Sequence, residues 1–315
     1  MSHRCVVLDD YQGVALQHVA WSRLEGVHVS AVREHLAGED LVAALAGADV
    51  VVAMRERTPF DAALLDRLPD LRLLVTTGRR NPSIDLDACR ERGITVCATS
   101  ALATPTVELT WALVLGLARH LLPESRALAG GGWQTTVGTD LAGSTLGVVG
   151  LGRIGSRVAA LGQAFDMDVV AWSPHLTAER AAAAGVRAVG KEELIASADV
   201  VTLHLVLGPG THRTLGADEL ARMRPTAYLV NTARAGLVDT DALLAALDAG
   251  GIAGAGLDVH DTEPLPADHP VRTHPRVLAT PHLGYVTADN YRTFFTEAAE
   301  DVAAWLAGEP VRVLT

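Results

Sequence analysis

Three short stretches of this sequence each contain one side chain suited to acid–base or anion-binding chemistry. Each stretch follows a strand-like apolar run, and open α/β sheets bind ligands at the carboxyl ends of their strands. The stretches are NTARAGLVD (231–239), GLDVHDTEP (256–264) and ATPHLGY (279–285). Their candidate residues are Arg234, Glu263 and His282.

Together these side chains support proton transfer beside a bound carboxylate. An imidazole titrates near neutral pH, so His282 can give a proton to a carbonyl oxygen. Glu263, if it lies within hydrogen-bond reach, would orient the ring and favour its protonated form. The planar guanidinium of Arg234 offers a fork to a carboxylate and a carbonyl.

Each residue also has a plainer interpretation when it is taken singly. Arg234 could form a surface ion pair with Asp239. His282 could cap a turn after a proline, and Glu263 could lie in solvent. Their common position at strand ends favours the interpretation in which they act together.

A glycine-rich motif, Gly150-Leu-Gly152-Arg-Ile-Gly155, lies between a strand-like run and a helical pattern. Gly150 would allow a tight turn, Gly152 the close approach of a pyrophosphate, and Gly155 close packing of helix on strand. The helix N-terminus would supply amide donors to the phosphates. The helical pattern rests on four apolar residues, Ile154, Val158, Leu161 and Phe165. The motif predicts dinucleotide binding, and the alternative is a structural turn with an empty crevice.

The elements that must position these residues are alternating strands and helices. This alternation predicts βαβ units and parallel sheets. We predict an α/β protein of two Rossmann-like, doubly wound parallel-sheet domains with an active-site cleft between them. One continuous sheet would need more strands than open sheets usually have. Thr104 and Pro105 look like the N-cap and first residue of a long helix that runs through Leu122. The predicted strands are RCVVLD, DVVVAM, LRLLVT, ITVCAT, STLGVVG, DVVAW, DVVTLHL, AYLVNTA, IAGAGLDV and RVLAT.

Composition narrows the class of partner. The chain of 315 residues is 49% hydrophobic and has a net charge of −11, which argues against nucleic acid or an anionic membrane as a partner. Its three cysteines have no metal-type spacing, and we expect neither a disulfide framework nor a metal site. The start, MSHRCVVLDD, lacks the features of a signal peptide, so we expect a cytoplasmic protein.

The order of the motifs GLGRIG, NTAR, LDVxxxEP and TPHLG resembles that of the D-isomer-specific 2-hydroxyacid dehydrogenase family, which includes phosphoglycerate, D-lactate and hydroxypyruvate-type enzymes. The resemblance covers nearly the whole chain. It implies an NAD(P)-dependent oxidoreductase that transfers a hydride between nicotinamide and a D-2-hydroxy acid/2-oxo acid pair, with Arg234, Glu263 and His282 as catalytic residues. It also implies a discontinuous substrate domain, residues 1–100 with 286–315, around a dinucleotide-binding domain at 101–285.

The same resemblance implies further contacts. The expected cofactor-binding residues are Thr106, Gly150, Gly152, Arg153, Ile154, Gly155, Ser173, His204, Thr232 and Asp258. The expected substrate-binding residues are Arg55, Thr77, Gly78, Arg79 and Tyr285. Thr77 to Arg80 take the place of the family's glycine-rich loop, whose amides hold the substrate carboxylate. The arginines there indicate either a second anionic group on the substrate or the general arginine bias of the chain. Two departures, Ala235 and Tyr285, put the identity of the substrate in doubt.

Ser173 ends a predicted strand where an aspartate usually accepts hydrogen bonds from the adenosine ribose and repels a 2′-phosphate. A serine can bond the ribose without repelling the phosphate. We therefore predict that both cofactors work, with NAD(H) preferred.

The resemblance suggests a homodimer formed through the cofactor domains, with Leu122–Gly143 contributing. Two other functions stay open. One is an NAD-sensing binding protein on the same fold, like the related corepressors. The other is a formate-type dehydrogenase, although such enzymes have Gln at the position of Glu263.

Overall fold

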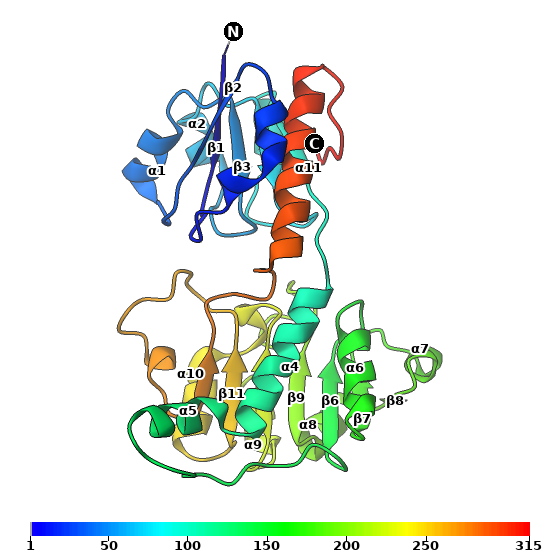
Figure 1. The fold of residues 1–315 in the computed structure, drawn as a ribbon. Helices are drawn as coiled ribbons and strands as arrows, with labels where there is room; N and C mark the ends of the chain where they lie inside the picture. The colour runs from blue at the N-terminus through cyan, green and yellow to red at the C-terminus, as the bar shows by residue number, and fades with distance from the viewer. Residues whose placement is uncertain (1) are drawn as a thin grey trace. The chain divides into compact units, whose positions relative to one another are not determined.

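The computed structural model describes residues 2–315, except for the side chain of Val19. The chain divides into two compact units. Unit 1 comprises Met1–Leu102 together with Val286–Thr315, and unit 2 comprises Ala103–Tyr285. Each unit contains one parallel sheet, of five and seven strands (Figure 1). The prediction of two parallel α/β sheets is confirmed.

Unit 1 is built on a parallel sheet with the strand order β2-β1-β3-β4-β5. From β1 the chain adds β2 on one side and β3, β4 and β5 on the other, so the switch point of the strand order lies between β1 and β3. This is the flavodoxin-like order. The strands are β1 (His3–Val7), β2 (Val27–Ala31), β3 (Val50–Ala53), β4 (Leu73–Thr76) and β5 (Thr95–Ala98). The helices are η1 (Ala15–Gln17), η2 (Val19–Arg23), α1 (Gly38–Leu45), α2 (Ala62–Asp66), α3 (Leu86–Glu91) and α11 (Ala288–Leu306).

Both ends of the chain contribute to unit 1. The long helix α11, drawn in red-orange in Figure 1, buries Phe294, Phe295 and Val302 completely. Residues beyond it return to the edge strand β5, where the Leu314 amide donates to Val96 and the Ala98 amide to Arg312. The Arg312 guanidinium pairs with the buried carboxylate of Asp301 at 2.8 Å.

Unit 2 is built on a parallel sheet with the strand order β12-β11-β10-β9-β6-β7-β8, whose switch point lies between β6 and β9. Counted from the β8 edge, the six strands up to β11 follow the strand order 3-2-1-4-5-6 of dinucleotide-binding domains. The strands are β6 (Thr145–Val149), β7 (Asp168–Trp172), β8 (Arg187–Ala188), β9 (Val200–Leu203), β10 (Tyr228–Asn231), β11 (Gly254–Leu257) and β12 (Val277–Ala279). The helices are α4 (Thr104–Ala118), α5 (Leu121–Ala129), α6 (Gly155–Ala164), α7 (Ala178–Ala183), α8 (Lys191–Ser197), α9 (Ala217–Arg222), η3 (Ala235–Leu237), α10 (Thr240–Asp248) and η4 (Pro270–Arg272).

Two apolar clusters hold the helices of unit 2 against its sheet. One includes Leu194, Leu220 and Leu243 from α8, α9 and α10. The other includes Trp111 from α4 and Val158 from α6. The sheet is therefore covered by helices on both faces, and the carboxyl ends of its strands are left to the connecting loops.

Several details differ from the sequence-based expectations. The edge strands β2 and β8 were not predicted. The helix expected to run from Thr104 through Leu122 has Ala103 as its N-cap and ends at Ala118, because His120 adopts a left-handed conformation (φ 49°) before α5 begins. In α6 the buried residues are Gly155, Val158, Ala159 and Gly162. Leu161, which was expected on that face, is 40% exposed, and Phe165 is the C-cap of the helix and 39% exposed.

Candidate active site

The strongest contact among the predicted site residues joins Glu263 and His282. The His282 Nδ1 lies 2.7 Å from the Glu263 Oε2. The side chains are only 14% and 20% exposed, for His282 and Glu263 respectively. The pair is therefore largely shielded from water. Because Nδ1 faces the carboxylate, Nε2 is the ring atom left for exchanging a proton with a substrate.

Backbone topology explains why these residues meet. Strands β10, β11 and β12 are parallel neighbours, so the loops after them lie at one edge of the sheet. Arg234 follows β10, Glu263 follows β11 and His282 follows β12. The sequence-predicted set thus comes from three adjacent strand ends.

Asp258 organises the turn that presents His282. Its buried carboxylate accepts hydrogen bonds from the Thr280 hydroxyl at 2.6 Å, the Leu283 amide at 2.7 Å and the Gly284 amide at 2.8 Å. Burial raises the pKa of Asp258, while these donors and the His282 ring oppose the shift. His282 itself has φ 54°, a strained conformation for a residue with a side chain. The three donors explain how that conformation is kept.

Arg234 is anchored through its backbone and points a partly buried guanidinium from an extended segment. The Asn231 side-chain amide donates to the Arg234 carbonyl at 2.9 Å, and Arg234 Nη1 donates to the Ala233 carbonyl. Asp239, which the sequence offered as a surface partner for Arg234, caps α10 and pairs with Arg213.

The glycine motif has the geometry that a pyrophosphate requires. Gly150 has φ 105°, and a Cβ there would meet the His204 carbonyl carbon at 2.7 Å. A Cβ on Gly155 would collide with the Gly150 carbonyl oxygen, so helix and strand pack too closely for any side chain. A Cβ on Gly152 would meet nothing within 4 Å, which leaves open space over the turn. The residues present therefore fit a dinucleotide.

Other predicted cofactor residues lie around this motif in unit 2. The Thr106 hydroxyl donates to the Gly284 carbonyl at 2.8 Å, linking α4 to the His282 turn. The Thr232 hydroxyl lies 2.7 Å from that of Thr110. Burial lowers the pKa of His204 to about 3, so its ring is neutral, and its Nε2 lies 2.9 Å from the Thr202 hydroxyl.

Ser173 follows the end of β7, and its hydroxyl makes no hydrogen bond within residues 2–315. Arg153 is exposed and Ile154 is the N-cap residue of α6. Tyr285, the last residue of unit 2, is buried with its ring edge-on to His282 at a centroid distance of 5.5 Å.

The predicted substrate loop of unit 1 is more internally bonded than expected. The Thr77 amide donates to Ala53, and the Gly78 amide donates to the Thr99 hydroxyl at 3.0 Å. Arg55 lies over Gly78, where its guanidinium occupies the space of a Cβ, and its Nη1 donates to the Thr77 carbonyl. Arg79 is exposed. The amides of Thr77 and Gly78 are thus already used within unit 1.

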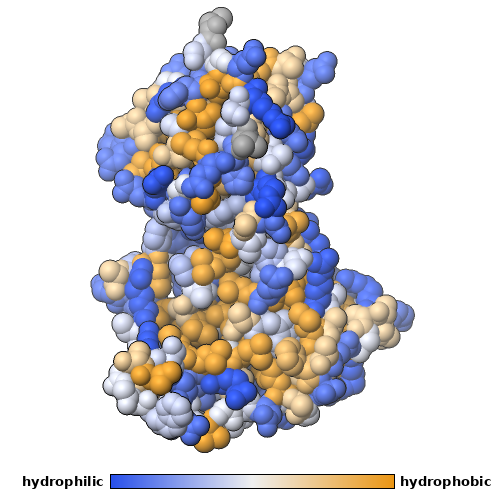
Figure 2. All heavy atoms as spheres, in the orientation of Figure 1, coloured by the Kyte–Doolittle hydropathy of each residue, from blue (hydrophilic) through white to orange (hydrophobic). Residues whose placement is uncertain are grey.

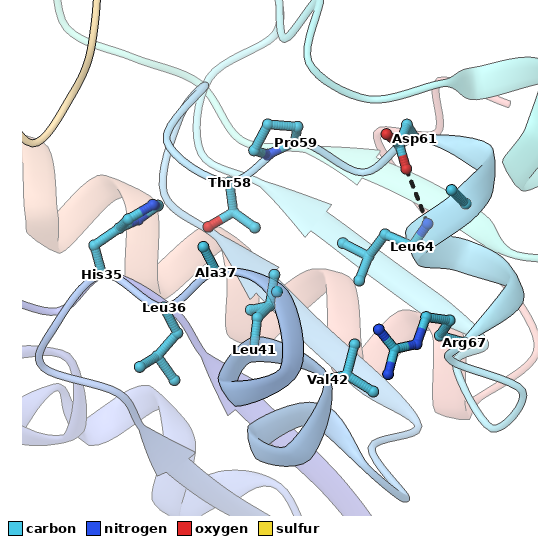
Figure 3. Close-up of a pocket in the computed structure, with 12 residues that line it drawn as sticks. His35, Leu36, Ala37, Leu41, Val42, Thr58, Pro59, Asp61, Leu64 and Arg67 are labelled. Carbon is cyan, nitrogen blue, oxygen red and sulfur yellow. Dashed lines mark hydrogen bonds between the residues drawn. The ribbon is translucent and has the colours of Figure 1, made fainter.

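A cavity of about 300 Å³ lies elsewhere in unit 1, between α1 and α2 (Figure 3). Its lining is mainly apolar, with Asp61 and Arg67 as charged members and His35 and Thr58 as uncharged polar members. None of the predicted substrate residues lines it. His35 and Thr58 bond the buried carboxylate of Asp9, at 3.1 Å and 2.9 Å.

Sequence reasoning missed Thr280 and Asn231, which hold the site through hydrogen bonds. Thr280 belongs to the motif TPHLG and Asn231 to the motif NTAR, which contain His282 and Arg234. Their positions within these motifs were the only sign in the sequence that they support the site. Among residues 2–315 no group of three or more His, Cys, Asp or Glu side chains is arranged to hold a metal ion. Within the same range no helix has the length and apolarity needed to cross a membrane.

Comparisons with known proteins agree with this geometry. Residues 111–284 match the family model described as D-isomer specific 2-hydroxyacid dehydrogenase, NAD binding domain. The chain is 37% identical over 261 residues to the D-3-phosphoglycerate dehydrogenase of Bacillus subtilis (strain 168), covering 82% of this chain and 50% of that protein. It is 36% identical over 259 residues to the glyoxylate reductase of Aeropyrum pernix, covering 79% of this chain and 77% of that protein.

A solved structure gives the same result for the fold. The phosphoglycerate oxidoreductase from Vibrio cholerae O395 superposes with a TM-score of 0.93 at 35% identity, covering 97% of this chain and 99% of that chain. The chain spans only about half the length of the phosphoglycerate dehydrogenases that it matches, 50% to 57% in the pairs compared. By its motifs, its sheet order and these similarities, the chain belongs to the D-isomer-specific 2-hydroxyacid dehydrogenase family.

Proposed function

We propose that this chain is an NAD(P)-dependent dehydrogenase that interconverts a D-2-hydroxy acid and the corresponding 2-oxo acid. The observation that supports this most strongly is the shielded Glu263–His282 pair in the same unit as the glycine motif. An acid–base group beside a dinucleotide site is what reduction of a carbonyl requires, because a proton must accompany the hydride.

The cofactor would lie across the carboxyl edge of unit 2. Gly150, Gly152 and Gly155 would hold its pyrophosphate, with Arg153 and Ile154 at the start of α6. Ser173 would bond the adenosine ribose, while Thr106, His204, Thr232 and Asp258 would contact or support the nicotinamide side. When bound, the nicotinamide supplies the hydride to C2 of the 2-oxo acid or accepts it from the hydroxy acid.

The side chains of unit 2 would do the rest. His282 gives a proton from Nε2 to the carbonyl oxygen in reduction and takes it back in oxidation. Glu263 holds Nδ1 and stabilises the imidazolium. Arg234 binds the carboxylate and carbonyl of the substrate through its fork, which fixes the face presented to the hydride.

The substrate is an open choice among small 2-oxo acids. D-3-phosphoglycerate and glyoxylate are named for the relatives and are the first to test. We propose that Arg55, Thr77, Gly78 and Arg79 add substrate contacts. Since the Thr77 and Gly78 amides are already bonded, the guanidinium groups are the better candidates for holding an anion. Tyr285, beside His282, would limit the size of the substrate.

The test is a panel of 2-oxo acids with NADH and NADPH, followed by absorbance. Consumption of the reduced cofactor identifies a dehydrogenase. His282→Ala should then lower turnover by about a hundredfold or more, because the proton donor is lost. Cofactor binding, measured by NADH fluorescence, should stay unchanged. Cofactor binding without turnover of any acid would favour the NAD-sensing alternative.

We also propose a homodimer that forms through unit 2. The arm formed by α5 and the loop up to Gly143 buries no large apolar side chain within the described chain. Trp133 is 75% exposed and Val137 is 91% exposed. Figure 2 shows hydrophobic residues gathered over α4 and α6. Leu161 of α6 and Phe165 directly after it are 40% and 39% exposed. A second copy of the chain would cover these side chains. A mass near 33.1 kDa by light scattering at micromolar concentration would reject the dimer.

For location, we propose the cytoplasm. Cys5, Cys89 and Cys97 are all buried as free thiols, as is usual for proteins of reducing compartments.

A further inference from the structure

His260 lies between Asp258 and Glu263 in the loop after β11, and it touches both halves of the site. Its backbone amide donates to the Glu263 Oε1 at 3.0 Å. Its ring Nε2 lies 3.0 Å from the Thr280 carbonyl oxygen, in the loop after β12. A carbonyl oxygen only accepts, so Nε2 must carry the hydrogen of this bond.

These contacts close a ring of four hydrogen bonds. The His260 amide donates to the Glu263 carboxylate, which lies 2.7 Å from the His282 ring. The His282 amide donates to the Thr280 carbonyl at 3.0 Å, and the same carbonyl accepts from the His260 ring. The Thr280 oxygen thus uses both of its lone pairs, one for each histidine. Within residues 2–315 two side chains of the β11 loop bond Thr280: the Asp258 carboxylate accepts from its hydroxyl, and the His260 imidazole donates to its carbonyl.

We propose that His260 is a positioning residue whose Nε2–H sets the separation of the two loops and so holds Glu263 against His282. The proposal rests on the proposed function, in which that pair transfers the proton. It follows from two facts about the ring. His282 has a strained backbone conformation that neighbouring bonds must maintain, and its amide shares its acceptor with His260. Without the imidazole donor, the Thr280 carbonyl keeps the His282 amide but loses its bond to the residue whose own amide holds Glu263.

Other groups around His282 do not replace this tie. Asp258 bonds Thr280, Leu283 and Gly284, so it ties the β12 turn to the start of the β11 loop, but it makes no contact with Glu263 among these bonds. The Tyr285 ring meets His282 edge-on, an apolar contact that restrains tilt. His260 differs from Asp258 in that it bonds both Glu263 and the His282 turn, so its ring acts on the spacing between carboxylate and imidazole.

The experiment compares three variants. His260→Phe keeps a ring but removes the donor, His260→Gln places an amide Nε2–H near the same point, and His274→Phe removes an imidazole that bonds Asp248 instead. In His260→Phe we expect kcat to fall about fivefold to tenfold, the effect of losing one buried hydrogen bond of a network, with KM changed by less than about twofold. His260→Gln should restore kcat to within about twofold, and His274→Phe should match the wild type.

A second readout does not depend on turnover. The Nδ1–H proton shared by His282 and Glu263 should give a strongly downfield proton NMR resonance, assigned by its loss in His282→Gln. That resonance should disappear or broaden in His260→Phe and persist in His260→Gln. Thermal denaturation checks that His260→Phe is folded.

The outcomes separate the two proposals. If the wild type turns over no 2-oxo acid, the proposed function fails and the resonance still tests the role of His260. An unchanged resonance in folded His260→Phe would overturn that role, as would its absence from the wild type. Failure of His260→Gln to restore kcat and the resonance would also overturn it, since the donor would then not be what matters.

Discussion

Replacing Glu263 by Gln removes the negative charge of the acid–base pair. It also turns one of the two acceptor oxygens into an NH2 group, which cannot accept from the His260 amide. The amide oxygen can still accept from His282 Nδ1, so the ring orientation should be kept. What is lost is the charge-assisted part of a 2.7 Å hydrogen bond between side chains that are only 14% and 20% exposed. Such bonds contribute about 1.5–3 kcal/mol, and at this exposure screening by solvent is limited. The protonated imidazole is destabilised by that amount.

The consequence is a slower reaction. In oxidation of the 2-hydroxy acid His282 takes up a proton and becomes positively charged, so without the carboxylate kcat should fall about tenfold to a hundredfold.

The assay is the initial rate of 2-hydroxy acid oxidation at saturating cofactor and substrate. Glu193→Gln is the matched control, because it removes a carboxylate from a surface ion pair with Arg187 in the same unit. An unchanged kcat in Glu263→Gln would refute the reasoning, because the charge of Glu263 would then not stabilise the imidazolium.

Three further expectations can be checked separately. Arg234→Lys should raise the KM for the 2-oxo acid about tenfold with a smaller change in kcat, because an ammonium cannot form the fork; an unchanged KM would reject the role. Ser173→Asp should leave NADH use intact and cut NADPH use about tenfold, or about 1.4 kcal/mol, in steady-state assays; the idea fails if the wild type already refuses NADPH and the variant behaves identically. Burial raises the pKa of Asp301 to about 6, so its contribution to stability is present below about pH 4 and is lost as pH rises through about 6. The free energy of unfolding of Asp301→Asn, relative to wild type, should therefore rise by about 2–3 kcal/mol from pH 4 to 7 in urea titrations, and a flat difference would contradict the shift.

The parts of the fold that the sequence could predict are those dictated by burial. Strands such as β3 and β10 are buried at every position and read as continuous apolar runs. The edge strand β2 contains exposed His28, and β8 has only two residues, so neither gives an apolar run. The break between α4 and α5 depends on one left-handed residue, His120, whose conformation is not marked by its type.

The candidate site divides in a similar way. Its chemistry follows from residue type, which is why Arg234, Glu263 and His282 stand out in the sequence. The supporting bonds do not, because they use backbone atoms. The contact of His260 with the Thr280 carbonyl spans twenty residues and leaves no mark in composition or spacing. The hydrogen bond from the Gly78 amide to the Thr99 hydroxyl could not be predicted from the sequence for the same reason.

The discontinuity of unit 1 has a consequence for the order of events during synthesis. Unit 2 is one continuous segment, but unit 1 lacks α11 until about two hundred further residues have followed Leu102. At ribosomal rates of about 5–20 residues per second, the wait is on the order of 10–40 s. During that time strand β4 and helix η2, which contact α11, lack the apolar side chains Phe294, Phe295 and Val302. The nascent chain therefore completes its second unit before its first, and the exposed face of unit 1 is where a chaperone would be needed most.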